Sequence, residues 1–292
     1  MDVQRATAWG DASDLIDILD VRPDGERAYL SVARGDHRRP VAEGSQMLGQ
    51  AIVAAGRHAP GRRAVSTHMV FTRVADATRP LRFDLDERSA GRTFTSLVVH
   101  VGQDGRECAT GMLLLDATAP EVMRHQLEPP DVPGPEQSEP YDMGVAGREV
   151  RIVDGAYTGD PDAPVGPPTL DAWVRFDAVP DDPSLHAGLL AQFTGHLSIA
   201  AAMRPHRGMG EALAHRSLST AVNAISLSLH ADVRADGWML YHHHSTYAGD
   251  GMTHSVCRVH DEGGGLLASF SVDAMVRGFR GGASPADERT AL

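Results

Sequence analysis

The sequence predicts an α+β protein made of two tandem units, in each of which one long helix packs against a curved antiparallel sheet. Three observations support this prediction. The order strand, helix, four strands occurs twice, a proline-rich segment separates the two copies, and each copy has one stretch with apolar residues at helical spacing. One such unit can bury a core between its helix and its sheet. Pairing the two sheets edge to edge would cover edges that otherwise invite aggregation.

The first unit is expected within residues 1–116. Alternating apolar residues predict a strand at 26–33, and apolar residues at helical spacing predict a helix at 44–55. Four more strands are predicted, and the last two are joined by Asp104-Gly105, a pair that tolerates the positive φ angles of a two-residue hairpin. These four strands are expected at residues 64–73, 80–87, 92–101 and 105–116.

Residues 117–145 are expected to form a linker that runs extended across the surface, because proline and acidic residues dominate there. The second unit, residues 146–280, repeats the pattern with a strand at 170–178 and a helix after it. Residues 281–292 are expected to be a flexible tail. The four remaining strands are predicted at residues 217–231, 237–247, 252–261 and 266–277.

The stretch at residues 187–206 is predicted to be one long, buried helix at the centre of the second unit. Leu189, Phe193 and Leu197 recur four residues apart and form one apolar stripe. His196 lies seven residues after Leu189, on the same stripe. Two interpretations stay open: a core histidine bonded to a backbone carbonyl, or a histidine directed into a ligand pocket, where it could move protons near neutral pH.

The composition narrows the classes of partner. Lys and Arg total 27 against 39 Asp and Glu, and this formal net charge of -12 argues against a protein that binds nucleic acid. We expect no membrane span, because no run approaches the about 20 apolar residues that a span requires, and no secretory signal. Cys108 and Cys257 lie in separate predicted strands without CxxC spacing, which indicates reduced core residues in a cytoplasmic protein.

No motif in the sequence predicts a metal ion or a cofactor. His242, His243 and His244 are adjacent, but neighbouring side chains of a strand point to opposite faces, and no second Cys or His cluster would complete a zinc site. The glycine-rich pieces at 263–265 and 281–282 lack the strand and helix that flank a dinucleotide-binding loop. GxSxG is absent, so the sequence does not indicate a serine hydrolase.

Short segments in both halves, taken in their order and spacing, match the pattern of a known protein family. In the first half they are GSQMLGQAIVAA at 44–55, STHMVF at 66–71 and GRTFTSLVVHVGQDGRECATGMLLL at 91–115. In the second half they are PDDPSLHAGLL at 180–190, MRPH at 203–206, WMLY at 238–241 and LASFSVDAMVR at 267–277. Together, over residues 41–116 and 170–277, the chain resembles the acyl-CoA thioesterase II family. The resemblance implies a tandem (double) hotdog fold with a pocket for an acyl thioester between the halves.

The resemblance also implies a catalytic triad in the second half. The family has an Asp on the second hotdog helix, a Thr or Ser on the following strand and a Gln on the last strand. Together they orient and activate water against the thioester carbonyl, which needs a proton acceptor and groups that stabilise the oxyanion. In this sequence the three positions fall on Gly195, Val222 and Val272. The fold is therefore expected to match the family, whereas its catalytic residues do not carry over.

The sequence allows a different site around His196. A histidine oriented by Asp273, with Thr220 or Asn223 in support, would be a competent general base. Asp273 would face this site only if the strand register differed by one residue, because such a slip reverses the face, and it would otherwise lie at the surface. Thr220 and Asn223 are equally open to interpretation as ordinary strand and turn residues. The residues expected to line the substrate are Gly195, Phe193, Val222, Val272 and His68.

Three functions remain open at this point. The first is an acyl-CoA thioesterase-like hydrolase that uses a non-standard site in the second half. The second is another acyl-thioester or polyketide-type enzyme, such as a dehydratase, isomerase or cyclase, and the third is a non-catalytic acyl-binding protein on the same fold. The expected partner is an acyl-CoA or an acyl-carrier thioester. Free sheet edges at the ends of the tandem unit also make a homo-oligomer a plausible expectation.

Overall fold

A computed structural model describes most of the chain. The described residues are 10–33, 40–157, 160, 162–177, 180–210, 213–214 and 217–279. The tail expected at residues 281–292 lies outside the described residues. No helix within the described ranges is long and apolar enough to cross a membrane.

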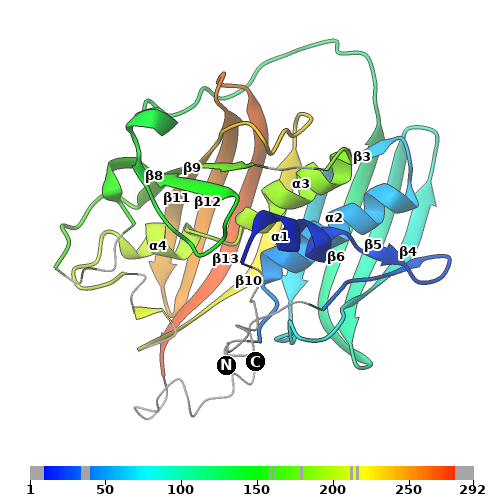
Figure 1. The fold of residues 1–292 in the computed structure, drawn as a ribbon, viewed down its shortest axis with the longest axis horizontal. Helices are drawn as coiled ribbons and strands as arrows, with labels where there is room; N and C mark the ends of the chain where they lie inside the picture. Colours follow the sequence, from blue (N-terminus) through cyan, green and yellow to red (C-terminus); the bar gives the residue numbers. More distant parts are fainter. Residues whose placement is uncertain are drawn as a thin grey trace, which may run out of the picture.

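The described strands form one thirteen-stranded antiparallel sheet, and the helices α1 (Ala12–Leu19), α2 (Gly44–His58) and α3 (Pro183–Phe193) lie on one face of it (Figure 1). The order of the strands is β1-β2-β4-β5-β6-β3-β10-β13-β12-β11-β9-β8-β7. The two halves meet where β3 (Arg62–Phe71) pairs with β10 (Leu218–Leu229). The predicted edge-to-edge pairing of the two sheets is therefore confirmed.

The strands of the first half follow the predicted pattern. The strand expected at 26–33 is shorter, whereas the four later ones differ from the expected bounds by a few residues. The hairpin at Asp104-Gly105 is confirmed, with φ angles of 51° and 73°. The remaining strands of this half are β1 (Arg22–Pro23), β2 (Ala28–Leu30), β4 (Arg82–Ala90), β5 (Phe94–Gln103) and β6 (Arg106–Ala117).

The second half has the predicted strands and two that were not predicted, β7 and β8, which form one edge of the sheet. Its strands are β7 (Glu139–Pro140), β8 (Arg148–Ile152), β9 (Thr169–Phe176), β11 (Met239–Gly249), β12 (Met252–Asp261) and β13 (Leu266–Gly278). Between β6 and the short 3-10 helix Pro135–Gln137, residues 118–134 form neither helix nor strand. The end of this segment is anchored to the second half, where Trp173 Nε1 donates a hydrogen bond of 2.9 Å to the carbonyl of Pro133.

The central helices α2 and α3 pack against each other through glycines. A Cβ at Gly49 would lie 2.7 Å from the carbonyl oxygen of Gly188, and a Cβ at Gly56 would lie 2.9 Å from the Cβ of Ser184. The contacts run in opposite directions along the two helices, so α2 and α3 are antiparallel. As a result, the start of α2 lies beside the end of α3.

The helix α1 was not predicted. Its N-cap Asp11 accepts a hydrogen bond from the backbone N–H of Asp14 at 2.9 Å, which satisfies one of the unpaired donors of the first turn. It lies against the central helices, where Gln50 Nε2 donates to the carbonyl of Ile18 at 2.8 Å. Its side chains join the apolar core that is continuous through both halves.

The prediction of one helix at residues 187–206 is wrong. α3 ends at Phe193, and a second helix, α4 (Ser198–Met203), begins after four intervening residues. Leu197 between them has a φ of 67°, in the left-handed region that is unfavourable for leucine. The apolar spacing continues across the break because Leu197 is buried in the turn as well. Periodicity alone therefore does not reveal where the helix stops.

Candidate functional site

Polar side chains from both halves meet where the start of α2 faces the break between α3 and α4. Glu43 is the N-cap residue of α2, and its Oε2 lies 3.8 Å from Nε2 of His196 in the break. Gln192, in the last turn of α3, donates a hydrogen bond from Nε2 to the same oxygen at 3.3 Å. One carboxylate of the first half thus contacts two side chains of the second.

The ring of His196 is held in a mostly buried position. It stacks on Phe193, with 4.8 Å between the ring centroids and 3° between the planes. Burial lowers the pKa of His196; Glu43 and the carbonyls of Gln192 and Phe193 oppose this shift, and the charge of Arg148 reinforces it. Nδ1 makes no hydrogen bond with any described residue. A neutral imidazole of this kind can accept a proton at neutral pH.

Arg148 on β8 brings a positive charge to the same place. Its Cζ lies 5.4 Å from the centroid of the Phe193 ring, within the range of a cation–π contact. Burial lowers its pKa to about 10, while Glu43 and Tyr241 act in the opposite direction. The guanidinium therefore remains charged at neutral pH beside Glu43 and His196.

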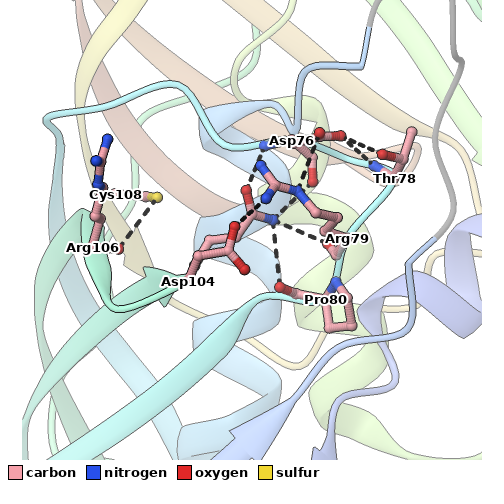
Figure 2. Close-up of polar contacts among 8 residues, drawn as sticks. Asp76, Thr78, Arg79, Pro80, Asp104, Arg106 and Cys108 are labelled. Carbon is pink, nitrogen blue, oxygen red and sulfur yellow. Dashed lines mark hydrogen bonds and ion pairs between the residues drawn. The ribbon is translucent and has the colours of Figure 1, made fainter.

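The loop between β3 and β4 fixes the chain that leads into Glu43. The backbone N–H of Ala42 donates to the carbonyl of Ala75 at 2.9 Å. This loop is held in turn by Gln103, whose Oε1 accepts from the N–H of Asp76 and whose Nε2 donates to the carbonyl of Asp76, both at 2.8 Å. Figure 2 shows the network around Asp76, which includes an ion pair of Arg79 with Asp104 and Asp76.

Gly195 lies against α2 rather than against open space. A Cβ at Gly195 would be 2.8 Å from the Cβ of Ser45 and closer still to its Oγ. The sequence predicts that Gly195 lines the substrate, which would require open space beside its backbone. In the structure, Ser45 fills that space.

The structure does not bring Asp273 to His196. On β13 the buried residues Phe270, Val272 and Ala274 face the helices, and Asp273 points to the opposite face, between Ala224 and His254 on the neighbouring strands. The register shift that a pairing with His196 requires does not occur. The alternation of side chains along the strand therefore rules out this pair.

On β10, the pairing with β13 directs Val222 and Thr220 to the helix-facing side of the sheet. Val222 lies opposite Ala274 and packs against the apolar core, and Thr220 lies on the same face opposite Val276. Asn223 occupies the bulge between Val222 and Ala224, and its Oδ1 is buried without a hydrogen-bond partner among the described residues.

His68 lies at the seam between the halves, on the outer face of the sheet. It is exposed, and its Nδ1 is 2.7 Å from the Oγ of Ser226 on β10. The buried neighbours Thr67 and Met69 point to the helix side. His68 is therefore separated from His196 by the sheet.

Sequence reasoning missed Glu43, Arg148 and Gln192. Gln192 lies four residues before His196, so helical spacing could have identified it as a neighbour on one face. Glu43 directly precedes α2 and Arg148 begins β8, so both are distant from His196 in the chain, and no local signal links them to it. Within the described residues, no group of three or more His, Cys, Asp or Glu side chains could hold a metal ion.

Comparisons with known proteins agree with this architecture. A family model described as the acyl-CoA thioesterase N-terminal domain matches residues 35–115, and one described as the C-terminal domain matches residues 124–271. Acyl-coenzyme A thioesterase 8 of Rattus norvegicus is 26% identical, over 94% of this chain and 93% of its own length.

Solved structures support the same fold. The chain is similar to an acyl-CoA thioesterase II from Mycobacterium marinum, with a TM-score of 0.75 and 24% identity over 91% of this chain and 99% of that one. A hot dog fold protein from Alicyclobacillus acidocaldarius aligns with a TM-score of 0.73 and 16% identity, over 91% and 98% of the two chains. The predicted α+β double hotdog is confirmed.

Proposed function

This chain belongs to the acyl-CoA thioesterase II family and is a thioester hydrolase, and on that premise we propose that His196 activates the hydrolytic water. The observation that carries the proposal is the contact of His196 with Glu43 across the two halves. A histidine beside a carboxylate is a suitable general base, because the carboxylate stabilises the imidazolium that forms. The partner of His196 in this proposal is Glu43 in place of Asp273.

The reaction follows from these roles. His196 accepts a proton from water as the oxygen attacks the thioester carbonyl, and a tetrahedral oxyanion forms. When the C–S bond breaks, the imidazolium returns the proton to the thiolate, which gives the free acid and coenzyme A. Arg148 and the N–H groups at the start of α2 supply positive potential for the oxyanion. In support, Arg148 is buried next to Glu43, whose side chain makes no cap hydrogen bond to α2 within the described residues.

We further propose that Val222, Val272 and Thr220 form part of the wall of the acyl pocket. They share the face of the sheet that is turned toward the central helices. The family resemblance implies polar catalytic groups at two of these positions, and the valines found there suit an acyl chain better than water. No role is proposed for Asp273 or His68, which lie on the outer face.

We also propose that the protein acts in the cytoplasm. Both cysteines are free and buried, which is consistent with the reducing cytoplasm. For the division of the chain, we propose residues 1–116 and 146–280 as the two hotdogs with 117–145 between them.

An acyl-CoA substrate follows from the family, and an acyl-carrier protein is the alternative source of the same thioester.

The test is thiol release from a panel of acyl-CoAs by the wild type and by His196→Gln and Glu43→Gln. Loss of a general base typically lowers kcat by about 10²–10⁴-fold, so we expect that loss for His196→Gln and a smaller one for Glu43→Gln. His100→Gln is a matched control, because His100 pairs with Glu107 at 2.8 Å on an exposed part of β5. Wild-type thiol release by His196→Gln would overturn the assignment. Dehydration or proton exchange without thiol release would contradict hydrolysis at this site.

A further inference from the structure

His243 is a fully buried histidine that the proposed reaction does not use. It lies on β11, and its Nδ1 is 3.1 Å from the Oγ of Ser198 and 3.3 Å from the Sγ of Cys257. Its Nε2 has no hydrogen-bond partner among the described residues. Burying a polar ring is unfavourable unless it forms hydrogen bonds. A histidine at this position therefore indicates that its ring has a structural or functional role.

Ser198 connects His243 to the break in the helix. It is the first residue of α4 and directly follows Leu197, whose left-handed conformation costs about 1–2 kcal/mol for a residue other than glycine. Such a conformation persists only where the surrounding contacts impose it. Strands β11 and β12 both contact Ser198: its Oγ meets His243 and Cys257, and its carbonyl accepts a hydrogen bond of 3.3 Å from the Oγ of Ser255. The chain is therefore fixed immediately after His196.

Tyr241 fixes the chain on the other side of the break. Its hydroxyl donates to the carbonyl of Leu190 at 3.0 Å, and its ring packs edge-on against Phe193 at 4.9 Å. Phe193 in turn stacks on His196. Tyr241 and His243 are two residues apart, so both point from β11 toward the helices. One strand thus holds both ends of the turn that carries His196.

We propose that His243 is a positioning residue, which holds Ser198 and thereby directs the ring of His196 toward Glu43. The proposal rests on the proposed role of His196 as the base. The ionisable groups near His243 are Cys257 on β12, His196 in the turn before α4, and Tyr241 and His242 on β11 itself. Burial, reinforced by the charges of His242 and His196, lowers the pKa of His243 to about 3. His243 is therefore neutral at neutral pH, and its contact with Ser198 is that of an uncharged ring.

The test compares His243→Leu, His243→Asn and Ser198→Ala for kcat, KM and the pH dependence of kcat. A displacement of about 1 Å at a reacting group can cost about 10²-fold, so we expect His243→Leu and Ser198→Ala to lower kcat by about 10–100-fold with KM nearly unchanged. The acidic limb of their pH profiles should move to lower pH, because His196 loses the nearby charge of Glu43. His243→Asn keeps a polar atom near the position of Nδ1 and should retain most of kcat. His244→Leu, at the adjacent exposed position of β11, is the control.

Each outcome decides the inference. Wild-type kcat and an unchanged pH profile in Ser198→Ala would overturn the positioning role of His243. If His243→Leu does not fold, the Ser198→Ala variant alone tests this role. A loss of kcat with a shifted acidic limb in Ser198→Ala, together with rescue in His243→Asn, would support it. If His196→Gln is inactive while Ser198→Ala is fully active, the positioning role of His243 is overturned and the role of His196 as the base stands. Fully active His196→Gln would overturn the proposed function itself.

Discussion

Ser45, the second residue of α2, packs so closely on Gly195 that a Cβ at Gly195 would be 2.8 Å from the Cβ of Ser45. This contact joins the first half of the chain to the turn of the second half that carries His196. The two positions are therefore coupled: a larger residue at one requires a smaller residue at the other.

The first prediction follows from this coupling. Gly195→Asp should destabilise the protein by about 1–3 kcal/mol, as overpacking of a close contact does, and should lower thiol release. The double variant Ser45→Gly/Gly195→Asp removes the obstructing side chain and should recover most of the stability. Urea unfolding of the two single variants and the double variant measures the coupling. Additive effects of the two substitutions would contradict the close contact.

The pH dependence of catalysis should report the charges around His196. Glu43 raises and Arg148 lowers the pKa of His196, while burial lowers it most. The acidic limb of kcat/KM should therefore lie below the ordinary value of about 6.5. Glu43→Gln should move this limb to lower pH, and Arg148→Met should move it to higher pH. Profiles of kcat/KM against pH for both variants check the prediction, and shifts in the same direction would refute it.

Stability should also depend on pH through the buried histidines. The folded-state pKa of His243, about 3, lies below the unfolded value of about 6.5, so the unfolded chain binds more protons between these two pH values. The stability contributed by the neutral ring is complete above pH 6.5 and is lost as the pH falls toward 3. From pH 6.5 to 5 this single group should account for about 2 kcal/mol. Urea unfolding at several pH values should show a shallower decline in His243→Asn than in the wild type.

The packing of α2 on α3 gives a further prediction. Gly49→Ala would place a Cβ 2.7 Å from the backbone oxygen of Gly188, which cannot move as a side chain can, so we expect a loss of about 1–3 kcal/mol. Gly134→Ala is the control, because no atom lies within 4 Å of the added Cβ and φ is -66°. Chemical denaturation of both variants checks the difference. Equal stability of Gly49→Ala and Gly134→Ala would show that the helices do not pack as described.

Much of the fold could be predicted from the sequence, because its signals are local. Alternating side chains define strands such as β12, and the Asp104-Gly105 pair defines its hairpin through the φ angles that these residues tolerate. The start of α2 at Gly44 was predicted from helical spacing alone. The edge-to-edge pairing also followed, since two similar units with open edges have few other ways to cover them.

The sequence by itself thus determined two repeated units, their strands and a histidine at the centre of the second. Only the tertiary structure decided the break at Leu197, the face to which Asp273 points, and the choice of Glu43 as the neighbour of His196. Periodicity depends on residues a few positions apart. The break at Leu197 and the choice of Glu43 depend on contacts between segments that are dozens of residues or more apart in the chain, and the face of Asp273 depends on the register of its strand against its neighbours. A one-residue change in register reverses a face, and no pattern within a single strand encodes it.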